Sequence, residues 1–169
     1  MSRIDHPFGP LYSDHSRILV LGSFPSIRSR EQNFFYGHPQ NRFWKVISAV
    51  FHEPLPQTVR EKRDMILLND LALWDSIASC EIAGSSDASI RNAEPNDISC
   101  ILNNCSIEHI YCNGRKSHDL YCRYIEPQTG RRAECLPSTS PANARWTLER
   151  LIESWSVLNM QYLTKESGQ

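Results

Sequence analysis

Short apolar runs alternate along the chain with segments whose large apolar side chains recur at helical spacing. The run at residues 17–22 (RILVLG) is rich in branched side chains and stops at a glycine, which is typical of a buried parallel strand that ends in a turn. Residues 41–51 (NRFWKVISAVF) place apolar side chains every three or four positions, which predicts an amphipathic helix packed against the sheet. Together the two segments predict a first βα unit.

The alternation continues to about residue 158. Helices are expected at 60–68, at 97–103 with Asn96 as cap, at 116–124, and from Asn143 or Ala144 to about Leu158. Strands are expected at 107–112 and 132–136. The segment at 71–74, which is followed by Ile77 and Ala78, resembles a strand but is ambiguous. Because parallel strands need a crossover of about a dozen residues or more, this order predicts an α/β fold, a three-layer α/β/α sandwich with a short, mainly parallel central sheet. The 169 residues suit a single domain, with its core at about 17–157 and a frayed tail after about 163.

Ligands of such sheets bind beyond the carboxyl ends of the strands. The loops expected at that edge are residues 22–29, 74–75, 113–116 and 137–143. We therefore expect a functional site to be built from these four loops.

Composition narrows the class of protein. No stretch approaches the about 18 unbroken apolar residues of a membrane helix, and the N-terminus lacks the apolar core of a signal peptide, so a soluble, cytoplasmic protein is expected, associated with the nucleoid if bacterial. The six cysteines form no CxxC pair, which argues against a zinc ribbon or an iron–sulfur site. We expect reduced thiols in the core, with no metal and no cofactor.

Charge is unevenly distributed although the net charge is only −1. Residues 17–45 hold five basic and one acidic side chain, residues 111–150 hold seven basic and four acidic, and residues 53–108 hold four basic and ten acidic. This asymmetry is compatible with a basic face for a phosphate backbone, and equally with an ordinary solvated surface.

Two motifs carry a resemblance to a known family. Residues 22–26 (GSFPS), followed by 36–45 (YGHPQNRFWK), resemble the mismatch-specific branch of the uracil-DNA glycosylase superfamily, and residues 84–87 (GSSD) and 136–143 (LPSTSPAN) reinforce the match. The proline- and serine-rich form of both motifs resembles the hypoxanthine-DNA glycosylase branch. The resemblance covers about residues 17–157 and implies the fold of that superfamily.

Two positions depart from the superfamily pattern. Phe24 stands where the mismatch-specific enzymes have a catalytic asparagine and the uracil-specific ones an aspartate, and Leu136 stands where the uracil-specific enzymes have a histidine. Catalysis has therefore moved to another residue, or the protein is not a hydrolase.

Asn41 is the best candidate for the catalytic role, because an amide can hold a water through its oxygen and contact base or sugar through its NH2 group. The alternative is a helix N-cap. Tyr36 aligns with the aromatic residue that stacks on the flipped base in the mismatch-specific enzymes, and its alternative is core packing. Phe24 either forms part of the pocket wall or packs within the turn.

The remaining pocket candidates are polar or small. Gly22 permits close approach of the backbone to the base. It opens a turn of Gly22, Ser23, Phe24, Pro25 and Ser26, whose backbone N–H groups can hydrogen-bond the edge of the base. His38 either donates to the base or a phosphate, or locks its loop. Asp75 and Asn113 end two expected strands at the same rim, and Asn113 is alternatively a turn residue.

A second group of residues is expected to contact DNA. Hydroxyls, an amide and helix N-terminal N–H groups suit contacts with phosphate, and arginine side chains could add further phosphate contacts. The candidate DNA-binding residues are Ser138, Thr139, Ser140, Pro141, Asn143, Arg145 and Arg42. Each arginine is alternatively part of a solvated face.

We therefore expect a monomeric, monofunctional DNA glycosylase that flips a deaminated base out of double-stranded DNA and hydrolyses its N-glycosidic bond. Hypoxanthine is the favoured base, with uracil or xanthine as further candidates. Lys45 and Lys116, the lysines near the motifs, lack the setting of a Schiff-base nucleophile. A catalytically silent nucleic-acid-binding protein and a hydrolase of small nucleosides or nucleotides are the alternatives.

Overall fold

A four-stranded parallel sheet forms the centre of the computed structural model, which describes residues 2–159. Its order is β3-β2-β6-β7, with β2 at Ile18–Gly22, β3 at Leu71–Asp75, β6 at His109–Asn113 and β7 at Glu134–Leu136. Every residue of β2 and β3 is buried, as expected for strands covered on both faces. The burial of β3 resolves the ambiguous segment at 71–74 as a strand.

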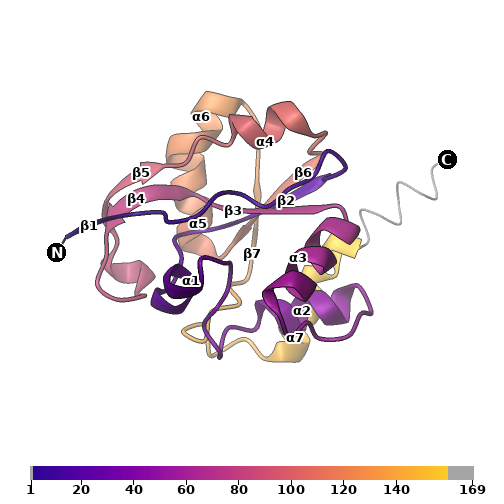
Figure 1. The fold of residues 1–169 in the computed structure, drawn as a ribbon. Coiled ribbons are helices and arrows are strands. Elements are labelled where there is room, and N and C mark those ends of the chain that lie inside the picture. The colour runs from indigo at the N-terminus through magenta and orange to yellow at the C-terminus, as the bar shows by residue number, and fades with distance from the viewer. Residues whose placement is uncertain (1, 160–169) are drawn as a thin grey trace.

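Helices cover both faces of this sheet (Figure 1). They are α1 Ile27–Gln32, α2 Phe43–Val50, α3 Val59–Leu68, α4 Ser99–Asn104, α5 Arg115–Leu120, α6 Glu126–Thr129 and α7 Leu148–Trp155, with a π-helical turn at Tyr121–Ile125 between α5 and α6. The helices α2, α3 and α7 lie on one side, and α4, α5 and α6 on the other. The predicted three-layer α/β/α arrangement is confirmed.

A second sheet was not predicted. It is antiparallel, in the order β1-β4-β5, with β1 at Arg3–Asp5, β4 at Ile77–Glu81 and β5 at Arg91–Pro95. The short sequences of β1 (RID) and β5 (RNAEP) lack an alternating apolar pattern, so backbone pairing alone defines them as strands. After β1 the chain runs along β3, where Leu11 and Leu73 exchange backbone hydrogen bonds of 3.0 and 2.8 Å.

Three local expectations are corrected. The loop expected at 22–29 contains the start of α1, because the Ser26 hydroxyl accepts from the N–H of Ser29 and caps this helix. The last helix begins at Leu148, capped by Thr147, and not at residue 143 or 144. Asn96 does not cap α4, since its buried side chain instead donates to the carbonyls of Asp75 at 2.8 Å and Ile77 at 3.1 Å.

The main core lies between the parallel sheet and its helices. Phe43 of α2 packs edge-on against Trp155 of α7, and neither side chain has exposed surface. The expectation of six core cysteines is correct only for Cys80 and Cys112; Cys100, Cys122 and Cys135 are exposed, and Cys105 is half-buried. Within residues 2–159, no helix is long and apolar enough to cross a membrane.

We predict that Asn96→Ala lowers the free energy of unfolding by about 1–3 kcal/mol, because two buried carbonyls lose their donor. Urea unfolding would measure the change. The control is Asn103→Ala, on the exposed surface of α4, which should stay within about 0.5 kcal/mol of the parent protein. Equal effects of the two substitutions would contradict this account of Asn96.

Candidate active site

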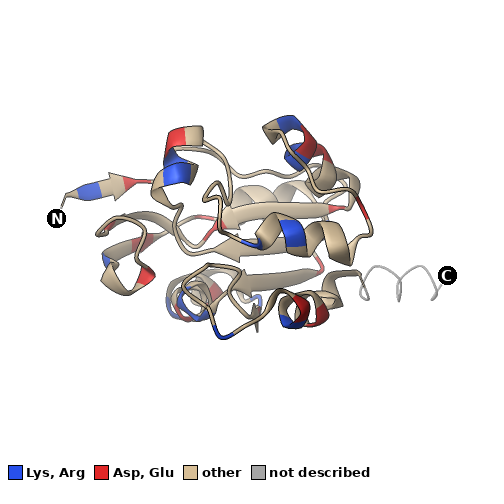
Figure 2. Cartoon of the chain, turned by 90° about the horizontal axis from the view of Figure 1, so that it is seen from below, with Lys and Arg blue, Asp and Glu red and all other residues tan. Residues whose placement is uncertain are grey.

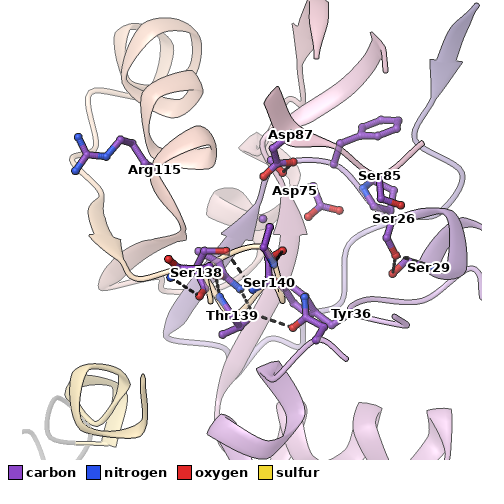
Figure 3. A pocket seen from close by; sticks show the side chains of 18 of the residues that line it. Ser26, Ser29, Tyr36, Asp75, Ser85, Asp87, Arg115, Ser138, Thr139 and Ser140 are labelled. Carbon is purple, nitrogen blue, oxygen red and sulfur yellow. Dashed lines mark hydrogen bonds between the residues drawn. The ribbon is translucent and has the colours of Figure 1, made fainter. Parts of the chain in front are cut away.

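A cavity of about 1000 Å³ lies beyond the carboxyl ends of β2, β3 and β6. It is lined by these residues expected from the sequence: Gly22, Ser23, Phe24, Pro25, Ser26, Tyr36, Asn41, Asp75, Asn113, Ser138, Thr139, Ser140 and Asn143. His38, Arg42, Pro141 and Arg145 are not among the lining residues. Figure 3 shows Ser138, Thr139 and Ser140 on the cavity wall with Tyr36, Asp75 and Asp87.

Thr139 connects the segments that form the cavity. Its hydroxyl donates to Asn41 Oδ1 at 2.9 Å and accepts from Asn113 Nδ2 at 3.0 Å, while its backbone N–H donates to Asn113 Oδ1 at 3.0 Å. The residue has no exposed surface. The structure therefore places Thr139 inside the protein as a link between Asn41 and Asn113, where it cannot reach a phosphate.

The amide of Asn41 is oriented by two hydrogen bonds to its oxygen. Besides the Thr139 hydroxyl, the N–H of Phe43, the first residue of α2, donates to Oδ1 at 2.9 Å. Asn41 thus makes a cap-like contact and also lines the cavity. Since both lone pairs of Oδ1 are used, the NH2 group is the part of the side chain left to act on a ligand.

Arg42 holds the loop between β7 and α7. Its guanidinium donates to the carbonyls of Ser140 and Asn143, each at 3.1 Å, and to that of Trp146. Its backbone N–H donates to the carbonyl of Thr139 at 3.0 Å. The guanidinium is therefore engaged inside the protein, in a role that the sequence did not predict.

Ser138 and Ser140 shape the same loop with their hydroxyls. Ser138 Oγ accepts from the N–H of Ser140 at 3.1 Å, and Ser140 Oγ accepts from the N–H of Ala142 at 3.2 Å. Asn143 Nδ2 donates to the carbonyl of Ser138 at 3.0 Å. Because α7 begins only at Leu148, no helix N-terminus is present at this loop, and its hydroxyl hydrogens are the groups available for a phosphate.

Tyr36 forms a wall of the cavity. One face of its ring stacks on Phe43, with the ring centroids 3.9 Å apart, and its backbone adopts a left-handed conformation with φ of 54°. The hydroxyl is buried, and the side chain of Asn113 lies near it. Burial raises the pKa of Tyr36, and the nearby Asp75 carboxylate raises it further, so the phenol keeps its proton and is a potential donor.

The first motif joins the cavity to the antiparallel sheet. Ser23 Oγ donates to Asp87 Oδ1 at 2.7 Å. Although Asp87 is exposed as a residue, desolvation by the surrounding walls raises the pKa of its carboxyl group. Phe24 is buried with Ile77 and Cys80 in a second apolar cluster and also lines the cavity, so both of its expected roles fit the geometry.

Asp75 ends β3 and is 5% exposed. Its Oδ2 accepts from His6 Nε2 at 2.6 Å. His38, in contrast, shapes its own turn, because its Nδ1 accepts from the N–H of Gln40 at 3.1 Å and its carbonyl from the N–H of Asn41 at 3.0 Å. The loop-locking interpretation of His38 therefore has direct support.

Sequence reasoning did not identify several residues at the site. Arg115 and Trp146 line the cavity, and His6 contacts Asp75 from a segment that carries no motif. In Figure 2, basic and acidic residues lie beside each other on the helices, so this view shows no broad basic face. No group of three or more His, Cys, Asp or Glu residues within 2–159 is arranged to hold a metal ion.

Gly22 leaves space that Asp75 occupies. A Cβ at Gly22 would lie 2.4 Å from Asp75 Oδ1 and 3.2 Å from the Tyr36 hydroxyl oxygen. We predict that Gly22→Ala lowers the free energy of unfolding by about 1–3 kcal/mol, as overpacking does in protein cores. Urea unfolding would measure it, with Gly9→Ala as the control, because a Cβ at Gly9 meets no atom within 4 Å.

The clash can be assigned by repeating the substitution in an Asp75→Ala background. The cost of Gly22→Ala should shrink there, because the clashing oxygen is gone. An unchanged cost would show that Asp75 does not define the space at Gly22.

Comparison with known proteins agrees with this geometry. A family model described as the uracil DNA glycosylase superfamily matches residues 10–159. A hypoxanthine DNA glycosylase of Methanosarcina acetivorans is 32% identical over 155 residues, which cover 89% of this chain and 95% of the relative. A hypoxanthine DNA glycosylase of Methanosarcina barkeri is 29% identical over 151 residues, which cover 88% and 94%.

A solved structure has the same fold. The solution NMR structure of a candidate uracil DNA glycosylase from Methanosarcina acetivorans matches with a TM-score of 0.74 and 28% identity, over 90% of this chain and 96% of that one. Because the family model also spans nearly the whole described chain, the protein belongs to the uracil DNA glycosylase superfamily.

Proposed function

We propose that this protein is a monofunctional DNA glycosylase that releases hypoxanthine from deoxyinosine in DNA. The observation that carries the proposal is the meeting of both motifs at one cavity, where Thr139 of the second motif is hydrogen-bonded to Asn41 of the first. The names of the two Methanosarcina relatives support hypoxanthine as the base. Uracil and xanthine are proposed as weaker substrates, and a single chain as the active form.

The proposed substrate enters the cavity as an extruded nucleotide. A base inside a duplex is inaccessible to an enzyme, and extrusion costs a few kcal/mol. The cavity, at about 1000 Å³, is at the upper end of the usual range for ligand sites, so it has room for a base together with part of its sugar. Tyr36, whose ring is supported by Phe43, would stack on the base and contribute about 1–3 kcal/mol.

In the proposed reaction, water attacks C1′ of the sugar while the bond from C1′ to the base breaks and its electron pair leaves with the base. The departing base gains a proton, and an abasic site remains. Negative charge on that base is stabilised by a preorganised donor. Asn41 Nδ2 is suited to this role, or to donating to the oxygen of the attacking water, because the amide oxygen of Asn41 is already engaged.

A Schiff-base mechanism lacks a nucleophile at this site. Among the described residues that line the cavity there is no lysine. Lys45 is exposed on α2, and Lys116 lies on α5 outside the lining. We therefore propose hydrolysis by water, without cleavage of the DNA strand.

We predict that Asn41→Ala lowers the single-turnover rate of hypoxanthine release by about 100-fold or more, a loss typical of a positioned catalytic group. Asn41→Asp should lose as much, because it keeps the acceptor for Phe43 and Thr139 but replaces the NH2 donor by an acceptor. The rates would be measured on a duplex with one deoxyinosine by alkaline cleavage of the product, and duplex affinity should change little.

Gln40→Ala is the matched control, because Gln40 is an exposed neighbour whose side chain makes no hydrogen bond in the described chain. Its rate should equal that of the parent protein. Full activity of Asn41→Asp would assign catalysis to the amide oxygen and contradict the donor role. A parent protein that binds the duplex but releases no base would instead be a catalytically silent binding protein.

The loop at Ser138 and Ser140 is proposed to bind the backbone of the lesion strand. We predict that a Ser138→Ala/Ser140→Ala variant raises the protein concentration needed for half-saturation, and does so more on duplex deoxyinosine than on single-stranded deoxyinosine. The reason is that backbone contacts must offset the cost of extruding the base from a duplex. Single-turnover rates across protein concentration would measure both.

The control is Ser106→Ala. Ser106 is an exposed serine before β6, and its side chain makes no hydrogen bond in the described chain. It should leave both substrates unaffected. If the double variant lost activity equally on both substrates with unchanged half-saturation, the loop would not have the proposed role.

A further inference from the structure

The proposed hydrolysis needs a group that takes a proton from the attacking water. Water has a pKa of about 15.7, so its attack on C1′ is faster when a positioned base accepts one of its protons. The first motif at residues 22–26 (GSFPS) carries no acid or base of its own, and the amide of Asn41 is not a base. The acceptor must therefore come from elsewhere on the cavity wall.

The described residues that line the cavity include five titratable side chains, which are Tyr36, Asp75, Asp87, Arg115 and Cys135. Three of them do not serve as bases. The Arg115 guanidinium is always protonated. Burial raises the pKa of the Tyr36 phenol and that of the Cys135 thiol, so both groups keep their protons near neutral pH. The two carboxylates of Asp75 and Asp87 remain.

Asp75 is engaged in the cavity wall. Its Oδ2 accepts from His6 Nε2 at 2.6 Å, and the Asp75 and His6 side chains are only 6% and 3% exposed. Its Oδ1 lies 2.4 Å from the position that a Cβ at Gly22 would take, so the carboxylate is packed against the backbone of β2. A carboxylate fixed in this way offers little accessible surface to a water.

Asp87 is open to the cavity. Its Oδ1 accepts from Ser23 Oγ at 2.7 Å, whereas Oδ2 accepts no hydrogen bond from any residue within 2–159. The residue is exposed and lines the cavity, and Figure 3 shows it on the cavity wall near Asp75. One oxygen of Asp87 is therefore held in place, and the other is free to contact a water.

The loop that carries Asp87 is anchored to the helix that follows the first motif. Asp87 begins a 3-10 turn between β4 and β5. The N–H of Ile27 donates to Ser85 Oγ at 3.0 Å, and the Arg30 guanidinium donates to the carbonyl of Gly84 at 2.7 Å. Both donors belong to α1. The place of Asp87 is thus set by contacts with α1 as well as by the hydrogen bond from the first motif.

We propose that Asp87, held by the positioning residue Ser23, is the catalytic residue that accepts a proton from the attacking water. As the water oxygen bonds to C1′ and the bond from C1′ to the base breaks, one water proton passes to Asp87 Oδ2 and the electron pair leaves with the base. The protonated carboxyl group then gives this proton to the departed base. The products are a neutral free base, an abasic site and the regenerated carboxylate, so no further reactant is needed.

The charge and environment of Asp87 suit this step. The sugar gains positive charge as the base departs, and a carboxylate stabilises such an oxocarbenium-like state. Desolvation by the cavity walls raises the pKa of Asp87, and the hydrogen bond from Ser23 lowers it; among the charges that face it, Asp75 on β3 raises it and Lys116 on α5 lowers it. Because the pKa is raised on balance, this carboxylate is a better proton acceptor than an ordinary one.

The proposal rests on the proposed release of hypoxanthine and names the residue that activates the water. The test measures single-turnover release of hypoxanthine from a deoxyinosine duplex from about pH 4 to about pH 8, where a carboxyl group with a raised pKa titrates. In the parent protein the rate should fall as the pH drops through the pKa of Asp87, because a protonated carboxyl group accepts no proton. In Asp87→Asn the rate at neutral pH should be about 100-fold lower, and it should no longer fall in acid.

Asp64→Asn is the matched control. It also removes one negative charge, from an exposed side chain of α3 that makes no hydrogen bond or ion pair in the described chain, and it should keep the rate and the pH profile of the parent. Asp75→Asn separates the two carboxylates. Its acid limb should remain and move to lower pH, because the charge of Asp75 raises the pKa of Asp87. An acid limb that is lost in Asp75→Asn and kept in Asp87→Asn would assign the proton to Asp75 and overturn the proposal.

Ser23→Ala gives a second test that leaves the carboxylate in place. The variant lacks the hydrogen bond that lowers the pKa of Asp87, so its acid limb should move to higher pH. Its rate at neutral pH should fall by about 10-fold, as expected for a lost hydrogen bond to a charged group. Ser23→Thr keeps the hydroxyl and should restore the profile of the parent. An acid limb that does not move in Ser23→Ala contradicts the positioning role of Ser23.

Failure of the proposed function would give a different result. If the parent protein released no hypoxanthine at any pH, the proposed function would fail, and the role of Asp87 with it. If the parent released the base and Asp87→Asn kept both the rate and the acid limb, only the role of Asp87 would be refuted.

Discussion

The hydroxyl of Thr139 is buried between two asparagine amides, and it donates to Asn41 while it accepts from Asn113. A hydroxyl is the only small side-chain group that does both. A valine would fill the same volume and leave the Asn41 oxygen and the Asn113 NH2 group each short of a partner, at a cost of about 1–3 kcal/mol for each buried group. This oxygen atom therefore joins β6, the entry to α2 and the loop before α7, and the backbone N–H of Thr139 and the contacts of Arg42 hold the same segments from either side.

The charges at the cavity are unusual for a protein proposed to bind a polyanion. Asp75 and Asp87 line it, and Arg115 is its only lining arginine or lysine among the described residues. Two carboxylates inside the cavity repel phosphate and tolerate a neutral base, which suits the proposed entry of a base while the backbone stays outside the cavity. Under the proposed function, contacts to the backbone would come from hydroxyls and from exposed side chains such as Arg145, and would be weaker than those of a basic groove.

The elements that the sequence predicted well are those whose own residues carry a strong pattern. The apolar run of β2 and the helical spacing in α2 leave little choice of structure, and the polar strand ends locate the cavity because all parallel strands finish at one edge. The strand β5 was missed because its sequence, RNAEP, has no apolar face and becomes a strand only through pairing with β4. The start of α7 was misplaced because Arg42, about a hundred residues earlier, holds residues 140–146 in a loop.

The contact of His6 with Asp75 could not be predicted for a related reason. The two residues are 69 positions apart, and His6 lies in a segment without periodicity. Only the antiparallel pairing of the N-terminal segment with β4 and β3 brings them together. The roles of Asn41 were left open by the sequence because a cap and a cavity residue occupy the same place, and the structure shows that one amide makes the capping contact from the cavity wall.

The position of His6 directly after the outer strand β1 has a further consequence. The segment around it is held by β1 pairing with β4 and by the hydrogen bonds of His6 and Leu11 to Ala78 and Leu73, and such peripheral strands open at a lower free energy than the strands of a central sheet. Opening of this segment would remove the donor from Asp75 while the parallel sheet stays intact. The contact of His6 with Asp75 would then be lost at a milder temperature or denaturant concentration than the fold, and an affinity tag or fusion partner attached just before Arg3 would perturb the cavity wall at Asp75 more than the yield of the protein.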